Sequence, residues 1–248
     1  MPFSPKPREN SSKRPAALPE AAPDHAAITF GGLKLTPDVS GVLHVPELDT
    51  LIIADIHLEQ GTSLARRGIR VPPYDTHLTI TQLEQVVNRF KSRRLIFLGD
   101  SFHDHEGEDR LEEDLLARLA TVAGAHDTFW ICGNHDPLPP QKLPGHAADH
   151  ILLGPLLLRH EPGRLDDGML EISGHLHPGC GVTQRGRRVY GKCFIADSRR
   201  LIMPAFGAYT GALPVYANAY RGLFAHDETS VWMLGRERIY KFPFHRVG

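Results

Sequence analysis

The chain has 248 residues and a mass of 27.6 kDa, and its 41% hydrophobic and 23% charged residues are ordinary values for a globular protein with a large α/β core. Its formal net charge of -1 excludes a strong overall attraction to nucleic acid, although arginines cluster locally, as at Arg66 and Arg67. No apolar run approaches the roughly 20 residues that span a bilayer, and the polar N-terminus lacks a signal-peptide core, so we expect a soluble, cytoplasmic protein.

The N-terminal segment differs in composition from the rest of the chain. Residues 1–27 mix Pro, Ser, Lys, Arg, Glu and Ala, with almost no large apolar side chains. Such a segment cannot bury enough surface to offset the entropy lost on ordering. We therefore predict a disordered tail over residues 1–27 and a single domain over residues 28–248, in which we find no linker and no internal repeat.

The first half of this domain alternates strand patterns with helix patterns. Strands are expected at 28–30, 33–35, 42–45, 51–54, 95–98 and 128–131, and helices at 76–90 and 111–122. A polar linker is expected between His57 and Thr76. Continuous apolar runs, as at 51–54 and 95–98, are typical of strands buried on both faces. The alternation predicts a parallel sheet with covering helices.

After Pro144 the pattern changes to short strands separated by Gly and Pro. They are expected at 151–153, 156–159, 169–172, 181–183, 189–196, 200–203, 231–234 and 238–241. No helical stretch of comparable strength follows. This half predicts a second, more antiparallel sheet packed on the first, and so an α/β fold with two packed sheets.

Polar side chains of one chemical kind follow several of these strands. In chain order they are Asp55, His57, Asp100, Asn134, His135, Asp136, His160, His175 and His177. Because ligands bind at the carboxyl ends of strands in open α/β sheets, we expect these residues to meet. Gly133, just before Asn134, is expected to let the backbone turn sharply enough to aim its neighbours.

The donor set suits a site for two transition-metal ions. Singly, each member has an ordinary explanation, such as a core histidine for His160 or a helix cap for Asp100. With 15 His and only three Cys in the chain, the set of imidazoles, carboxylates and one amide favours Mn, Fe, Zn or Ni over Ca or a thiolate-preferring metal. Seven of these nine residues as ligands would be too many for one ion that must also leave room for substrate, but they suit two ions that share a carboxylate. Such a centre stabilises phosphoryl transfer.

The ordered motifs resemble those of the calcineurin-like binuclear metallophosphoesterases. The matching runs, within residues 50–180, are Asp55-x-His57, Gly99-Asp100, Gly133-Asn134-His135-Asp136, His160 and Gly174-His175-x-His177. The resemblance implies a four-layer α/β/β/α sandwich of two packed mixed sheets, with the metals at the strand ends. One departure is visible, because His160 precedes Glu161-Pro162 where the wider superfamily often has Gly.

The resemblance also implies a role for each residue. One metal would be held by Asp55, His57 and His177, and the other by Asn134, His160 and His175, with Asp100 as the bridge between them. His135 would not bind metal but would donate a proton or hydrogen bond to the leaving oxygen or the scissile phosphate. Asp136 would orient the His135 imidazole.

Several loops are similar to those of the bacterial ligase-associated DNA-damage-response phosphoesterases, namely residues 54–59, 65–68, 71–76, 99–104 and 160–162. Members of that family are encoded near an ATP-dependent DNA ligase, an exonuclease and a Lhr-type helicase. They are similar to Mn-dependent endonucleases of single-stranded DNA. The similarity implies two divalent ions, with Mn2+ expected, a single-stranded DNA or RNA substrate, and a functional association with the ligase, exonuclease and helicase.

Two residues of these loops are candidates for substrate binding. Arg67 could make a bidentate contact with phosphate, and His103, three residues after Asp100, lies within reach of the same edge. A plain surface charge for Arg67 and a helix cap for His103 are the alternatives.

These observations favour a metal-dependent phosphodiesterase or endonuclease that hydrolyses single-stranded nucleic acid in DNA repair, by attack of a metal-bridging hydroxide. The alternative is a small-molecule phosphatase or phosphodiesterase, for example one acting on nucleotides, on the same fold. A non-catalytic scaffold is disfavoured, because no ligand is lost and His135 is in place.

Overall fold

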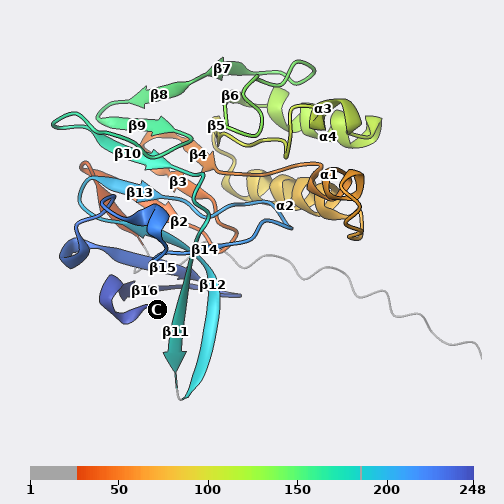
Figure 1. The fold of residues 1–248 in the computed structure, drawn as a ribbon. Coiled ribbons are helices and arrows are strands. Elements are labelled where there is room, and N and C mark those ends of the chain that lie inside the picture. The colour runs from red at the N-terminus through yellow and green to blue at the C-terminus, as the bar shows by residue number, and fades with distance from the viewer. Residues whose placement is uncertain (1–26, 185) are drawn as a thin grey trace, which may run out of the picture.

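Two mixed β-sheets pack face to face in the computed structural model, which describes residues 27–184 and 186–248 (Figure 1). The predicted tail over residues 1–27 lies, apart from Ala27, outside the described residues. None of the described helices combines the length and the apolar character needed to cross a membrane.

The first sheet has seven strands in chain order. They are β1 (Ile28–Phe30), β2 (Leu33–Pro37), β3 (Leu43–Val45), β4 (Thr50–Ile53), β5 (Arg94–Leu98), β6 (Asp127–Ile131) and β7 (His146–Ala148). Neighbours from β1 to β4 are antiparallel, whereas β4, β5, β6 and β7 are parallel. The carboxyl ends of β4, β5 and β6 therefore meet at one edge, as the apolar runs predicted.

Helices cover the outer face of this sheet (Figure 1). They are α1 (Gln60–Arg66), α2 (Asp75–Phe90), α3 (Gly107–Arg110) and α4 (Glu113–Gly124), with a 3-10 turn, η2 (Pro46–Leu48), before β4. The apolar stripes of α2 and α4 pack on side chains such as Leu51 and Phe97 of β4 and β5. The expected linker after His57 contains α1, which the sequence did not reveal because Gln60–Arg66 has no apolar stripe.

The second sheet has nine strands. They are β8 (His150–Leu153), β9 (Leu156–Arg159), β10 (Leu170–Ser173), β11 (Pro178–Gln184), β12 (Arg187–Ala196), β13 (Arg200–Ile202), β14 (Leu213–Pro214), β15 (Ser230–Leu234) and β16 (Ile239–Pro243). Their order is β14-β11-β12-β13-β10-β9-β8, with β15 beside β12 and β16 beside β15. The central strands β9, β10 and β13 are parallel, whereas most other neighbouring strands are antiparallel, so this sheet is mixed but more antiparallel than the first, as predicted.

Three apolar clusters separate the layers. One lies under the helices, and a second fills the space between the sheets, where Ile52 and Ile96 meet Leu158 and Phe194. The third covers the outer face of the second sheet with loops and the 3-10 turns η3 (Asn218–Tyr220), η4 (His226–Glu228) and η5 (Phe244–Arg246). In the described part of the chain no α-helix follows α4, so this outermost layer consists of loops and 3-10 turns.

Candidate metal centre

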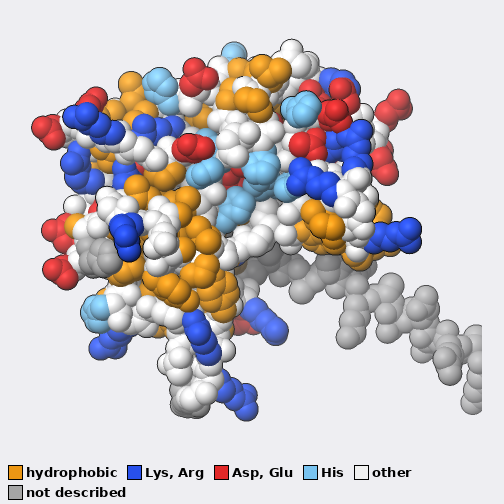
Figure 2. Space-filling model, viewed as in Figure 1, with side chains coloured by type: hydrophobic (Ala, Val, Ile, Leu, Met, Phe, Trp, Pro, Cys, Tyr) orange, Lys and Arg blue, Asp and Glu red, His pale blue; other side chains and the backbone are white. Residues whose placement is uncertain are grey.

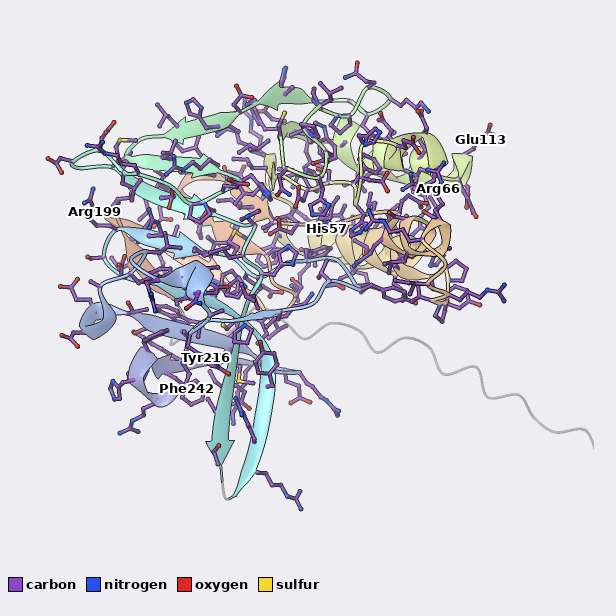
Figure 3. All side chains as sticks on the ribbon, in the orientation of Figure 1. His57, Arg66, Glu113, Arg199, Tyr216 and Phe242 are labelled. Carbon is purple, nitrogen blue, oxygen red and sulfur yellow. The ribbon has the colours of Figure 1, made fainter. Side chains whose placement is uncertain are left out.

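The predicted ligands converge at the edge where parallel strands of both sheets end. Asp55 and His57 follow β4, Asp100 follows β5 and Asn134 follows β6 in the first sheet. The second sheet contributes His160 after β9, and His175 and His177 after β10. Figure 3 labels His57 near the middle of the molecule, between the strands and the helices, and histidine side chains reach the surface there in Figure 2.

One group of side chains contains Asp55, His57 and His177. The Nε2 atoms of His57 and His177 lie 3.2 Å apart, and Nε2 of His177 lies 3.6 Å from Oδ1 of Asp55. At most one of two facing imidazole nitrogens can donate a hydrogen to the other. Three donor atoms that turn toward one point suit a cation.

A second group contains Asn134, His160 and His175. Oδ1 of Asn134 lies 3.0 Å from Nε2 of His160 and 2.9 Å from Nδ1 of His175. The two histidine nitrogens lie 3.2 Å apart. This group therefore presents one amide oxygen and two imidazole nitrogens to a common point.

Asp100 lies between the two groups. Its Oδ2 atom is 3.5 Å from Nε2 of His57 and 3.4 Å from Nε2 of His160. Its other oxygen, Oδ1, accepts a hydrogen bond from the backbone N–H of His135 at 2.9 Å. The carboxylate is thus anchored by one oxygen and presents the other to both groups, as a bridging ligand must.

The spacing of the donor atoms fits metal ions. Bonds of about 2.1 Å to one ion place adjacent ligand atoms roughly 3.0 to 3.4 Å apart in octahedral or tetrahedral geometry. Within the two groups the separations range from 2.9 to 3.6 Å. The residues present therefore fit two divalent transition-metal ions, with Asp100 shared.

The backbone at these residues is strained in a consistent way. Asp55, His57, Asp100, His175 and His177 all have positive φ, between 42° and 65°. Few residues other than glycine adopt this left-handed region, and non-glycine outliers cluster at functional sites. Most of the described non-glycine residues with positive φ are predicted ligands.

Two glycines leave room for the carboxylates. A Cβ on Gly133 would lie 2.1 Å from Oδ1 of Asp100, and a Cβ on Gly174 would lie 2.5 Å from Oδ2 of Asp55. The φ of Gly133 is not in the left-handed region. Gly133 therefore does not use a conformation reserved for glycine; the chain still bends just after it, at residues 134–135, and the missing side chain lets Asp100 approach the chain after β6.

Burial and charge shift the pKa values in the centre. Burial lowers the pKa of His57 to about 3 and so keeps this imidazole neutral, the form that binds metal. Burial also opposes the charge on His160, but Asp100 and Asp55 outweigh it and raise the pKa of His160 to about 9. The two buried carboxylates thus create a field that attracts cations.

His135 is held at the exposed side of the centre. Its backbone N–H binds Asp100, and its Nδ1 donates to the backbone oxygen of His103 at 2.8 Å, since a carbonyl can only accept. The ring lies 5.1 Å from the ring of His57. Because Nδ1 is engaged by His103, Nε2 is the nitrogen that can exchange a proton with a substrate.

Asp136 has a different contact from the one expected. Its Oδ2 accepts a hydrogen bond from the backbone N–H of Phe102 at 2.9 Å, and its buried Oδ1 has no hydrogen-bond partner. The expected support of the His135 ring by Asp136 is therefore wrong, because the carbonyl of His103 performs it. Asp136 instead fixes the segment after Asp100, and burial raises the pKa of Asp136 to about 7.

The two candidate substrate residues lie beside the centre. The ring of His103 is 5.4 Å from that of His57 and 5.2 Å from that of His135, so it extends the row of imidazoles. Arg67 follows α1, is exposed, and adds a positive charge near His103. Its neighbour Arg66 is instead paired with Glu106.

Sequence reasoning missed several supporting residues. Oε1 of Glu161 lies 3.7 Å from Nε2 of His175, so the residue that marked a departure from the superfamily pattern faces a predicted ligand. Lys192 is half-buried, and its Nζ donates to the oxygens of Ala205 and Gly207 at 2.7 and 3.0 Å. Only its place directly before the apolar residues 193–196 of the same strand could have signalled it.

No protein-family model and no curated protein sequence matches this chain. Among solved structures, the nuclease MPE of Pseudomonas putida is similar, with a TM-score of 0.68, 23% identity, and coverage of 87% of this chain and 98% of that one. The phosphoesterase YfcE of E. coli matches with a TM-score of 0.40, 18% identity, and coverage of 79% and 98%. The likeness to the P. putida protein shows a shared fold, and the chain has the α/β metallophosphoesterase fold that its motifs predict.

Proposed function

We propose that this protein is a metal-dependent phosphodiesterase that hydrolyses phosphodiester bonds of single-stranded nucleic acid. The observation that carries the proposal is the position of Asp100, which presents one oxygen to both donor groups at 3.4 and 3.5 Å. A shared carboxylate between two sets of imidazole and oxygen donors suits two ions that act on one phosphorus. The shared fold with the P. putida nuclease supports the same reaction class.

The protein's own residues have distinct tasks in this reaction. A pair of divalent ions, when bound, supplies Lewis-acid stabilisation of phosphoryl oxygens and an activated water. His135 holds its proton-exchanging Nε2 at the exposed side, where it can protonate the departing oxygen. His103 and Arg67 lie on the same side and can bind the non-bridging phosphate oxygens.

The proposal includes Mn2+ as the metal, DNA repair as the process, and a functional association with a DNA ligase, an exonuclease and a Lhr-type helicase. The first is supported by the mixed nitrogen and oxygen donors, which suit Mn2+. The other two are supported by the loops similar to those of the ligase-associated phosphoesterases, such as residues 54–59.

The direct test is hydrolysis by the purified protein with Mn2+. A 5′-labelled single-stranded 12-mer, a duplex of the same sequence and bis(p-nitrophenyl) phosphate are compared as substrates. We expect cleavage of the small diester and the single strand, with the duplex cut more slowly. Failure to cut either diester, in protein shown to hold two ions per chain, contradicts the proposal. Faster turnover of a phosphate monoester than of either diester favours the small-molecule phosphatase.

A further inference from the structure

The inward face of β12 changes from apolar to aromatic and basic as the strand leaves the core. Alternate residues of a strand share a face. On this face Phe194 is buried between the sheets, Lys192 is half-buried, and Tyr190 and Arg188 are exposed. Residues 187–192 pair with β11 in a hairpin that extends beyond the other strands (Figure 1). This face of the hairpin is therefore open to solvent.

Tyr190 and Arg188 pack directly on the backbone of β11 because glycines lie beneath them. A Cβ on Gly179 would lie 2.5 Å from Oη and 2.9 Å from Cζ of Tyr190, and a Cβ on Gly181 would lie 3.1 Å from Nε of Arg188. The backbone oxygen of Gly248 also lies beside Gly181. Side chains at these two positions would push the ring and the guanidinium away from the strand.

Tyr216, which follows β14, completes the surface. Arg188 Nη2 donates to the hydroxyl of Tyr216 at 3.2 Å, and the hydroxyl of Tyr190 donates to the backbone oxygen of Ala212 at 3.1 Å. Both tyrosines are about half exposed, Tyr190 at 46% and Tyr216 at 52%. We call Arg188, Tyr190 and Tyr216 the tyrosine platform.

The platform is continuous with the metal centre. β11 begins directly after His177, and the backbone N–H of Leu213 in β14 donates to the oxygen of His177 at 2.8 Å. Tyr190 pairs with Gly181, four residues beyond His177, which is about 13 Å along an extended strand. Figure 3 shows Tyr216 beside β11, below His57 in that view, and Figure 2 shows apolar surface between the central histidines and the hairpin.

Charge distinguishes this flank from the opposite one. From the start of β11 to the end of β12, residues 178–196, the sequence has four Lys or Arg and no acidic residue, although the whole chain has a net charge of -1. The flank around α3 instead has Asp104, Glu106, Glu108 and Asp109 within six residues. Because several of these acids are paired with Arg66, Arg110 and Lys142, it is the basic residues of the hairpin that attract a polyanion bound at the centre toward β11 and β12.

We propose that the tyrosine platform stacks the unpaired bases of the nucleic-acid strand whose phosphodiester lies at the metal centre. This inference rests on the proposed function and adds the path of the strand. Exposed aromatic faces beside a basic side chain bind bases of any sequence by stacking. A duplex is disfavoured, because its bases are already stacked on one another.

The test compares the wild type with the double variant Tyr190→Ala, Tyr216→Ala on the single-stranded 12-mer and on bis(p-nitrophenyl) phosphate. Loss of stacking lowers oligonucleotide affinity by about tenfold per ring. We therefore expect the ratio of kcat/KM for the 12-mer to kcat/KM for the small diester to fall about 100-fold, mainly through KM. The matched control is Tyr240→Ala, which removes a 41% exposed tyrosine of β16 that lies under Arg238, and this variant should keep the wild-type ratio.

A further variant separates stacking from a structural role. Tyr190→Phe keeps the ring but loses the hydrogen bond to Ala212, so it should retain the wild-type ratio. An equal loss in Tyr190→Phe and Tyr190→Ala overturns the platform, as does a wild-type ratio in the double variant. If the double variant keeps the wild-type ratio, contact with a protein would be the remaining role for the exposed tyrosines.

A binding measurement keeps this inference separate from the proposed function. Fluorescence anisotropy of the labelled 12-mer, with the full chain and Mn2+ at 4 °C, reports affinity with or without turnover. Weaker binding by the double variant, by about tenfold or more, supports the platform even if the wild type hydrolyses neither diester. Equal affinities overturn the platform even if the wild type is an active phosphodiesterase.

Discussion

The site has a buried part and an exposed part, which differ in structure. The buried wall consists of Asp55, His57, Asp100 and His160, none of them more than 5% exposed. The exposed rim consists of Asn134, His135, His175 and His177, which are half-buried or exposed. Among the predicted ligands, the pKa values shifted furthest belong to the wall. We infer that the wall would anchor the ions whatever the substrate, and that the rim, which supplies the remaining ligands, would also face the substrate.

Removing the shared charge of the wall should have the largest effect. Asp100→Asn preserves the shape of the side chain but leaves two cation sites without their common carboxylate, so we expect loss of at least one ion and a fall in kcat of about 1000-fold. Elemental analysis and hydrolysis of bis(p-nitrophenyl) phosphate measure the two effects. The control Asp109→Asn alters an exposed acid of α3 and should leave metal content and activity unchanged. Full metal content and activity in Asp100→Asn would break the distinction between wall and rim.

Removing the proton-exchanging imidazole of the rim should leave the ions in place. We expect His135→Ala to lower kcat by about 10²- to 10⁴-fold with two ions still bound, because general acid catalysis is lost and no ligand is removed. The control is His150→Ala, which alters an exposed histidine of β8. Loss of metal from His135→Ala would show instead that His135 helps to hold the ions.

Variants of two adjacent arginines distinguish a direct contact with substrate from a general effect of surface charge. Arg67→Ala should raise KM for the 12-mer about tenfold, because a charged hydrogen bond to phosphate is lost. Arg66→Ala removes the same charge one residue earlier, but its guanidinium is paired with Glu106, so we expect a smaller change in KM. Equal effects of the two variants would show that only the net charge of this loop matters.

The support behind the wall should affect stability more than activity. Lys192→Met removes donors to Ala205, Gly207 and Thr210 and should lower the free energy of unfolding by about 1–3 kcal/mol at pH 7. Burial lowers the pKa of Lys192 from 10.5 to about 8, so the folded protein binds this proton less tightly than the unfolded chain does. Stability of the wild type should therefore rise relative to the variant between pH 8 and 10.5. Urea denaturation at pH 7, 8 and 10 measures both effects, and a pH-independent difference would contradict the second.

The features that the sequence predicted correctly depend on short local patterns of apolar and polar residues. The apolar runs of β4, β5 and β6 marked buried parallel strands, and the polar residues directly after them had to meet at one edge. The sequence did not reveal the features that depend on contacts between segments far apart in the chain. Asp136 binds Phe102, 34 residues away, and Gly133 makes room for Asp100. The helix α1 is likewise held by tertiary contacts, such as that between Gly61 and Asp75, rather than by an apolar stripe.

The central claim is that two ions share Asp100 at the meeting edge of the two sheets. Anomalous diffraction at the manganese edge, from crystals of the full chain grown with Mn2+, tests this claim most directly. We expect two peaks, one beside His57 and His177 and the other beside Asn134 and His175, with Asp100 bound to both ions. A single peak, or two peaks without Asp100 between them, would contradict it.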